Sequence, residues 1–370
     1  MPPCGRAKAV KYTEASTLMS DLRRRVGAYF DDNGIDRCGG WRMLLKSGVI
    51  LSWAVGSYLA LLLWADAWWV IGLLAVSLAL ALAAIGFSIQ HDGGHGSYSS
   101  NRSVSRAAAW TLDLVGGSSY MWRHKHNILH HTYPNVEGAD DDISQMPWLR
   151  LCTTDPRLPM HRHQHWYAWF LYSLLAPRWI FIDDFKRIRT QRAGARRVQA
   201  PQGRSLAFLF VGKALAFTWI LVLPLALHGL SLGLLAVYFI VSWVWGATLA
   251  TAFQLAHCNT SADFVEWPRP GKGLELAWAE QQLATTVNFS PKNSLLTWYI
   301  GGLNYQVEHH LFPRICHLHY PAIRPIVRDV CREHGVRYRE HATFWDALAA
   351  HVDHLRRLGR APVEHGPTAS

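Results

Sequence analysis

The sequence predicts an all-α integral membrane protein, with four transmembrane helices in two hairpins and a helical cap on the cytosolic side. It contains four apolar runs of 22 residues or more, and a helix needs roughly 20 residues to cross a bilayer. The Lys and Arg residues lie almost entirely outside these runs. At 50% hydrophobic residues, the 370-residue chain is too apolar for a disordered protein.

The first hairpin is predicted from residues 43–64 and 67–89. Lys46, near the start of the first run, is the only charged residue in either of them. The link around Asp66 leaves room for nothing longer than a tight turn, so we expect the two helices to run antiparallel.

The second hairpin is predicted from residues 206–228 and 230–257, with its turn at Gly229. Lys213 is the only charged residue in these runs. Because a lysine side chain has a long apolar stem, we expect Lys213 to snorkel toward the membrane interface. Two shorter apolar segments, 166–176 and 104–120, fall short of a span and are expected to be interfacial helices.

The distribution of charge predicts the orientation. Residues 1–46 hold nine Lys and Arg and residues 178–204 hold eight, whereas the two hairpin tips hold none. The positive-inside rule therefore places both termini and the central loop in the cytosol, in a bacterial inner membrane or an endoplasmic reticulum. The formal net charge of +11 is explained by this topology, so we expect no binding to nucleic acid.

The predicted organisation has a cytosolic N-terminal segment (1–42), a membrane domain (43–330) and a cytosolic tail (331–370). The cap begins near Asn259. An amphipathic helix is expected around residues 21–30. The six Cys residues are scattered without a CxxC pair, which argues against a disulfide framework and against a thiolate zinc site.

Histidines form three clusters. His91 and His95 follow the second span, four residues apart, so they share a face if the helix continues. In the second cluster, His126 and His130 have the same spacing. In an α-helix, with 3.6 residues per turn, the next residue, His131, would point about 100° away from them. The third cluster reads Gln306-Val307-Glu308-His309-His310, and one further histidine, His257, ends the fourth span.

The predicted topology brings all of these residues to one side of the membrane. A single histidine near a membrane is usually a structural hydrogen-bonding group, but three such clusters on one face favour a metal site. Eight imidazoles exceed the coordination of one metal, so two ions are expected, and imidazole suits iron, zinc, copper or nickel. The remaining histidines are not expected to be ligands, among them His124, His161, His163, His165, His317 and His319.

On these residues the chain resembles the membrane fatty acid desaturases. Their three histidine boxes have the forms HxxxH, HxxHH or HxxxHH, and HxxHH or QxxHH, and here they read HDGGH, HNILHH and QVEHH. The flanking segments HKHNILHHTYPN and NYQVEHHLFP are also similar to the family, and the similarity covers about residues 45–330. Gln306, at the start of the third box, resembles the front-end and linoleoyl-CoA-like branch.

The resemblance implies a di-iron centre that uses O2 to introduce a cis double bond into an acyl-CoA or acyl-lipid. The ligands that it implies are His91, His95, His126, His130, His131, His257, His309 and His310. Gln306 takes a position that is His in other branches, and Phe253 takes the place of an Asn that holds a metal-bound water in the stearoyl-CoA branch. An acyl chain also implies a long apolar tunnel between the spans and the cap.

Other polar residues near the boxes have two interpretations. Asp92, Asn127 and the run Asp140, Asp141 and Asp142 are expected to orient ligand imidazoles. For the aspartate run, loop solvation or helix capping is an equal alternative. Gly93 and Gly94 predict close packing at the site. Because no HPGG haem motif is present, we expect electrons to come from a separate cytochrome b5 or ferredoxin.

Three alternatives remain open. Hydroxylation of an acyl or sphingolipid chain uses the same chemistry and scaffold. A zinc membrane hydrolase is suggested by the HExxH-like spacing of HDGGH, with Asp92 in place of the Glu. A metal transporter is disfavoured because transport sites lie near the bilayer midplane, whereas these clusters lie at or beyond the ends of the spans.

Overall fold

The computed structural model describes residues 11–13, 16–193, 196–268 and 272–361. Regular structure in these residues is almost entirely helical, as predicted. The first half holds α1 (Thr17–Asp32), α2 (Gly40–Leu63), α3 (Trp68–Ala84), η1 (Ile85–Gln90), α4 (His91–His95), α5 (Arg102–Leu114), α6 (Ser119–Trp122), η2 (Arg123–His130), η3 (Pro159–His163), α7 (Gln164–Ser173), α8 (Leu175–Arg178), η4 (Trp179–Asp183) and α9 (Asp184–Thr190).

The second half holds α10 (Arg204–Phe217), η5 (Thr218–Val222), α11 (Leu223–His228), α12 (Leu232–His257), α13 (Trp278–Thr285), α14 (Ser294–Tyr299), α15 (Gln306–Leu311), η6 (His317–His319), α16 (Tyr320–Glu333) and α17 (Phe344–Arg360). Two minimal sheets complete the described structure. Strands β1 (Arg192–Ala193) and β2 (Arg196–Arg197) pair antiparallel, and β3 (Asn288–Phe289) and β4 (Glu340–His341) pair parallel.

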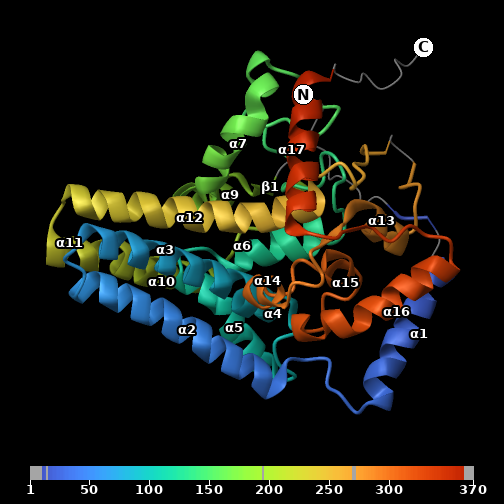
Figure 1. Ribbon diagram of the computed structural model, residues 1–370, viewed down its shortest axis with the longest axis horizontal. Coiled ribbons are helices and arrows are strands. Elements are labelled where there is room, and N and C mark those ends of the chain that lie inside the picture. Colours follow the sequence, from blue (N-terminus) through green and yellow to red (C-terminus); the bar gives the residue numbers. More distant parts are fainter. Residues whose placement is uncertain (1–10, 14–15, 194–195, 269–271, 362–370) are drawn as a thin grey trace.

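In the described residues, four helices are long and apolar enough to cross a membrane: Gly40–Leu63, Trp68–His95, Arg204–His228 and Leu232–His257. They coincide with the four predicted runs, but the second continues further, because α3, η1 and α4 form one uninterrupted helix. The links between α2 and α3 and between α11 and α12 lie at the same end of the molecule (Figure 1, left). The sidedness of the membrane stays a prediction.

Small residues let the long helices approach closely. Ala75, Ala79 and Ala83 repeat every four residues along α3 and are fully buried. Such stripes are typical of helix contacts in membranes, where close packing replaces the hydrophobic effect. Gly246 on α12 has the same role, because a Cβ there would lie 2.3 Å from the carbonyl oxygen of Ser173 on α7.

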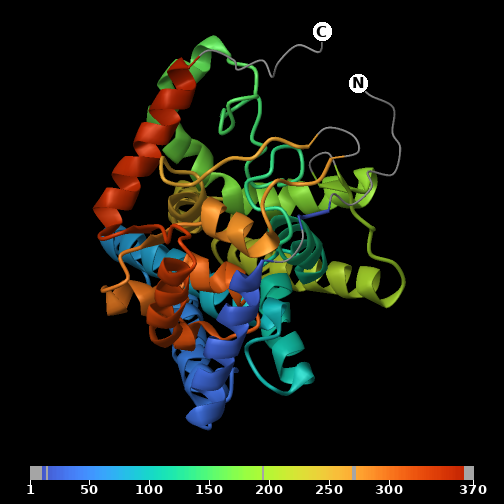
Figure 2. The same cartoon turned by 90° about the vertical axis from the view of Figure 1, so that its right-hand side faces the viewer.

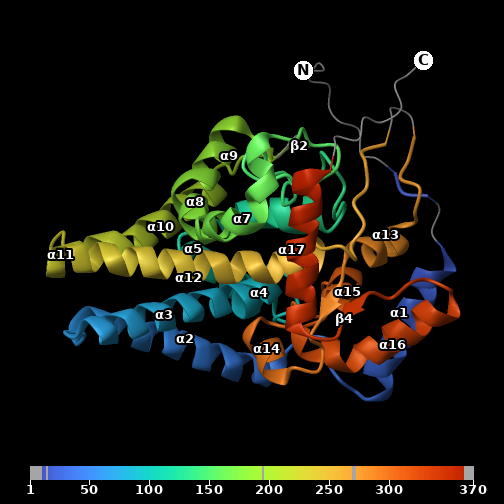
Figure 3. The ribbon, with the colours of Figure 1, turned by 45° about the horizontal axis from the view of Figure 1, so that its top comes forward.

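Helices α1, α13, α15 and α16 gather beyond the end opposite the two links, whereas α7 and α8 lie along α12 (Figures 1 to 3). The predicted amphipathic helix is confirmed as α1, whose buried face consists of Leu18, Leu22, Val26 and Phe30. This face packs in one hydrophobic cluster with residues of α13, α15 and α16. Helix α17 packs against α7 and α12. The predicted boundaries at residues 42 and 330 stay predictions.

The two short apolar segments are helical, as expected. Helix α7 buries Ala168 and Tyr172, while Trp166 and Phe170 are exposed at 72% and 48%. Helix α5 exposes Trp110. Their place at the membrane interface stays a prediction.

Lys213 does not snorkel, so this prediction is wrong. It is only 2% exposed, and its ammonium donates hydrogen bonds to Asp184 Oδ2 at 2.8 Å and to the carbonyls of Gly116 and Ile180 at 2.5 and 2.8 Å. Three acceptors match the three N–H groups of the ammonium, so the charge is satisfied inside the protein. The lysine thereby ties α10 to η4, to α9 and to the turn after α5.

Replacing Lys213 by Met is expected to lower the free energy of unfolding by about 3 kcal/mol, because it leaves the Asp184 carboxylate buried without a cation. Thermal unfolding of the full chain in detergent micelles measures the loss. The double variant K213M/D184L replaces the ion pair by apolar groups and is expected to recover most of it. An unchanged unfolding midpoint for K213M would contradict the structural role of the pair.

Candidate metal centre

The first histidine cluster forms the last turn of the second long helix. The helix passes through the π-helical turn η1 and continues to His95. His91 and His95 therefore share a face, as predicted, and their ring centroids lie 4.7 Å apart. Gly96 ends the helix in the left-handed region, at φ +74°, where glycine is favoured.

Gly93 and Gly94 make room for the neighbouring elements, as predicted. A Cβ on Gly93 would lie 2.4 Å from the backbone nitrogen of Ala109, and one on Gly94 would lie 2.2 Å from the ring of Trp122. Real Cβ atoms do not approach this closely, so both positions require glycine. Trp122 in turn stacks on His126, with centroids 4.5 Å apart.

The second cluster lies on the π-helix η2, and this corrects one prediction. In a π-helix each N–H bonds to the carbonyl five residues earlier, and the His131 N–H donates to the His126 carbonyl at 3.0 Å. His131 therefore lies one turn beyond His126, with their Nε2 atoms 3.2 Å apart. The expected rotation of His131 away from its neighbours, by about 100°, is wrong because it assumed an α-helix.

The third cluster and His257 complete the site. Helix α15 carries Gln306, His309 and His310, all buried, and His257 is the last residue of α12, as predicted. The ring of His309 lies 4.5 Å from that of His91, and the ring of His257 lies 4.6 Å from that of His130.

All eight predicted histidines converge on one buried cluster. Their ligand nitrogens form three groups in which the atoms lie within 4.8 Å of one another: His91, His95, His126 and His309; His130, His257 and His310; and His131, His309 and His310. Because His309 and His310 each belong to two groups, the three groups form one continuous set.

The ring nitrogens of this cluster fit metal ions. Seven of the eight imidazoles bury a nitrogen without a hydrogen-bond partner: Nε2 of His91, His95, His130, His309 and His310, and Nδ1 of His131 and His257. A buried polar atom without a partner is costly, and so many in one place call for a common partner. Imidazole nitrogens are ligands for iron, zinc, copper and nickel.

Three side chains contact the Nδ1 atoms of histidines in the cluster. His130 Nδ1–H donates to Asp140 Oδ2 at 2.9 Å, and His310 Nδ1–H donates to Gln282 Oε1 at 2.9 Å. The Tyr320 hydroxyl lies 3.1 Å from Nδ1 of His309. These contacts leave Nε2 of each ring for the cluster. Gln282 and Tyr320 could not be identified from the sequence, because they come from α13 and α16 and stand in no motif.

The protonation of the cluster suits metal binding. Burial, followed by the neighbouring histidines, holds the pKa values of His126, His131, His309 and His310 well below the ordinary value. These rings are neutral at pH 7, as ligands must be. His130 differs: burial lowers its pKa, but the Asp140 carboxylate outweighs this effect and leaves the pKa raised.

Of the residues expected to orient imidazoles, only some contact a histidine of the cluster. Asp140 is 1% exposed and bonds to His130, which supports the orienting interpretation for this residue over loop solvation. Asp141 and Asp142 instead pair with Lys125. Asn127 donates to the Gly94 carbonyl at 2.8 Å and contacts no imidazole through a hydrogen bond.

Gln306 and Phe253 lie beside the ring of His257. The Gln306 side-chain nitrogen is 2.8 Å from Nε2 of His257, and Phe253 stacks on that ring with centroids 4.8 Å apart. Phe253 offers no ligand atom. His124, which we did not expect to be a ligand, lies outside the three groups, with its Nδ1 2.9 Å from the Tyr120 carbonyl oxygen.

A cavity of about 410 Å³ lies between the long helices, on the side of the two links. Its wall is almost wholly apolar, with Leu78 and Leu82 from α3 and Trp245 from α12. This volume falls within the usual range of small-ligand sites, about 300–1,000 Å³.

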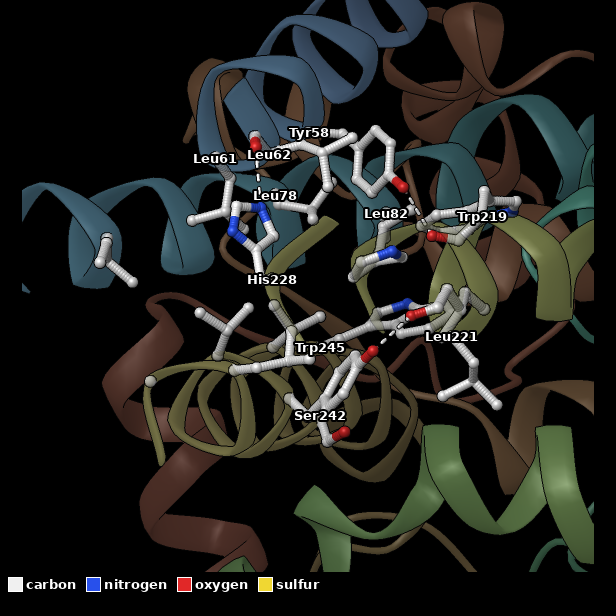
Figure 4. Close-up of a pocket in the computed structure, with 18 of the residues that line it drawn as sticks. Tyr58, Leu61, Leu62, Leu78, Leu82, Trp219, Leu221, His228, Ser242 and Trp245 are labelled. Carbon is white, nitrogen blue, oxygen red and sulfur yellow. Dashed lines mark hydrogen bonds between the residues drawn. The ribbon is translucent and has the colours of Figure 1, made fainter. Parts of the chain in front are cut away.

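Three polar side chains in the cavity wall bond to the protein backbone (Figure 4). The hydroxyls of Tyr58 and Tyr238 donate to the carbonyls of Trp219 and Ile220, at 2.6 and 2.8 Å. Both carbonyls belong to the π-helix η5. His228 Nε2–H donates to the Leu62 carbonyl at 2.9 Å. These bonds satisfy three polar groups of the wall, whereas the indole nitrogen of Trp245 has no hydrogen-bond partner among the described residues. The rest of the interior is apolar and suited to hydrocarbon.

Comparison with known proteins agrees with the site. The family model for fatty acid desaturases matches residues 66–342. The sn-1 linoleoyl-lipid 6-desaturase of Arthrospira platensis is 35% identical over 353 residues, covering 95% of each chain. The protein with the same name in Synechocystis sp. is 35% identical, covering 96% of this chain and 99% of its own length.

A third relative, the acyl-lipid (8-3)-desaturase of Physcomitrium patens, is 40% identical over 343 residues, covering 91% of this chain and 71% of its own length. The resemblance seen in the three histidine boxes is thus confirmed over most of the chain. The protein belongs to the fatty acid desaturase family.

Proposed function

We propose that this chain is a membrane-bound di-iron desaturase that introduces a cis double bond into the acyl chain of a lipid. The observation that carries the proposal is the convergence of eight histidines, six of them buried, of which seven hold a buried ring nitrogen without a hydrogen-bond partner. The names of the relatives favour an acyl-lipid over acyl-CoA as the substrate. Family membership favours desaturation over a zinc hydrolase or a metal transporter.

Two iron ions would divide the cluster between them. One group, His91, His95, His126 and His309, offers four nitrogens, and a second group, His130, His257 and His310, offers three. His131 lies between the two groups, within reach of His309 and His310. Gln306, which contacts His257, is placed to support the second group rather than to add a ligand of its own.

When bound, the iron pair would supply the redox chemistry that couples O2 to C–H cleavage. The overall balance is that the acyl chain loses two hydrogens, O2 receives four electrons and four protons in total, and two waters form. Two of the electrons and two of the protons come from outside the substrate. Asp140, Gln282 and Tyr320 would orient three of the rings, while burial keeps the pKa values of His126, His131, His309 and His310 low and excludes water.

The site would face the cytosol. The helices α4 and α12 both end at the cluster, on the side away from the two links. The positive charge of residues 1–46 and 178–204 also favours the cytosol for this side. Helices α13 to α17, together with α1, would then form the cytosolic cap, and a separate cytochrome b5 or ferredoxin would deliver electrons there.

The acyl tail would occupy the cavity between the long helices. Its apolar wall accepts hydrocarbon, and it shares the long helix Trp68–His95 and α12 with the histidine cluster. The tunnel expected between the spans and the cap would thus continue into the membrane-spanning region.

Expression in a host of known lipid composition tests the reaction. We expect new double bonds in the acyl lipids of the host, detected by mass spectrometry as a loss of two hydrogens and located by fragmentation. Cells that carry the H310A variant serve as the control. Products that gain one oxygen without losing hydrogen would instead establish the hydroxylase alternative.

Replacing His130, His131, His309 or His310 by Ala is expected to abolish turnover and to lower the iron content, because each removes a buried ligand. Metal analysis of the purified full chain gives the iron content, and membrane fractionation checks insertion. His124→Ala, a histidine close to the cluster but outside it, is the matched control and should keep both properties. Full activity in any of the four variants would refute the assigned site.

Ser242 lines the cavity from α12, and Ser242→Phe would place a ring inside it. We expect turnover on the longest acyl chains to fall by about tenfold while shorter chains are still converted, a magnitude typical of small volume changes in apolar pockets. Leu235→Phe, on an exposed position of the same helix, is the control. An unchanged chain-length profile for S242F would place the acyl tail elsewhere.

A further inference from the structure

Three buried polar side chains from different elements form a row that ends beside the metal centre. Lys46 comes from the first turns of α2, His317 from η6 and Asp92 from α4. They are 4%, 2% and 1% exposed. Lys46 Nζ lies 2.8 Å from His317 Nε2, and His317 Nδ1 lies 2.8 Å from Asp92 Oδ2.

The chemistry of these groups sets the direction of the hydrogen bonds. A lysine ammonium can only donate, so His317 Nε2 accepts and the ring proton stands on Nδ1. His317 Nδ1–H then donates to Asp92 Oδ2, and the backbone N–H of His317 donates to the same oxygen at 3.3 Å. Lys46 thus selects the tautomer that His317 needs to hold the carboxylate.

The row is not itself a metal site. Asp92, Cys316 and His317 lie close enough together to bind an ion. However, both ring nitrogens of His317 are engaged, one by Lys46 and the other by Asp92. The Lys46 ammonium also supplies the positive charge that the buried Asp92 carboxylate requires.

The second carboxylate oxygen of Asp92 extends the row to His91, one of the proposed ligands. Asp92 Oδ1 lies 3.8 Å from Nδ1 of His91, and both ring nitrogens of His91 are buried without a partner. Ligand histidines usually donate their second N–H to a carboxylate, which orients the ring and raises its basicity. A small rotation of the His91 ring would form this bond and leave Nε2 for the metal.

We propose that Lys46 and His317 are positioning residues for the metal centre: they fix the Asp92 carboxylate so that it orients the His91 imidazole. The row links the start of the first long helix to the end of the second through His317, which comes from a distant part of the chain. This inference rests on the proposed metal centre.

Matched variants of His317 test the proposal in the purified full chain. His317→Leu removes both hydrogen bonds, whereas His317→Gln keeps one donor for Asp92 and one acceptor for Lys46. We expect H317L and K46M to weaken iron binding ten- to a hundredfold, the usual cost of losing such a partner, and H317Q to recover most of the loss. Equilibrium titration of the apoprotein with Fe²⁺ measures the affinity.

A second readout separates positioning from folding. The absorption spectrum of the Co²⁺-loaded protein reports the ligand field, and we expect H317L and K46M to change it and H317Q to restore it. His319→Leu, in the same short helix but bonded to the Cys38 carbonyl, should leave affinity and spectrum unaltered. Wild-type affinity and spectrum in H317L and K46M would overturn the proposal, as would equal losses in H317L and H317Q.

The same titration separates this inference from the proposed function. An unaltered chain that binds no iron would refute the metal centre itself. Two irons in the unaltered chain, with unchanged binding in H317L and K46M, would refute only the positioning role.

Discussion

The structure depends on one demanding constraint: eight imidazoles share one volume, and seven of them hold a buried ring nitrogen without a hydrogen-bond partner. Burial and mutual proximity hold the pKa values of His126 and His131 low, whereas the Asp140 carboxylate outweighs burial at His130 and leaves its pKa raised. Residues at the ends of helices meet this constraint well, because the chain can leave the site after the last histidine and make room for the neighbouring rings. The second long helix accordingly ends at His95 and the fourth at His257, both in the cluster.

The four spans and the eight histidines could be predicted from sequence, because apolar length and residue spacing are local properties. Helical pitch could not. Two π-helical segments, η1 and η2, change the pitch on the way into the site, and η2 aligns His131 with His126 across five residues. With the 3.6 residues per turn of an α-helix, the His131 side chain would point away from that of His126. Trp122 stacks on His126 and also packs over Gly94, which lies 28 residues earlier in the chain. A contact between such distant segments is not visible in the local sequence.

The hydrogen bonds that hold Lys213 and His310 could not be predicted from the sequence either, because they too depend on residues distant in the chain. Whether a charge is buried depends on whether a partner reaches it, and that partner can lie anywhere in the chain. Lys213 meets Asp184 from the central loop, 29 residues away, and His310 meets Gln282 from α13, 28 residues away. No motif marks either partner. Asp140 was within reach of prediction only because it belongs to an acidic run that closely follows the second box.

The cavity and the histidine cluster share two helices, Trp68–His95 and α12. Trp245 in the cavity wall and His257 stand on α12, twelve positions apart, which corresponds to about 18 Å at 1.5 Å per residue. Leu82 and His91 are joined in the same way by the helix Trp68–His95. No loop interrupts either connection, so the distance from the cavity to the metal centre is set by rigid helices. An acyl tail in the cavity would therefore meet a fixed limit on the number of carbons beyond the reacting bond, whatever head group the lipid carries.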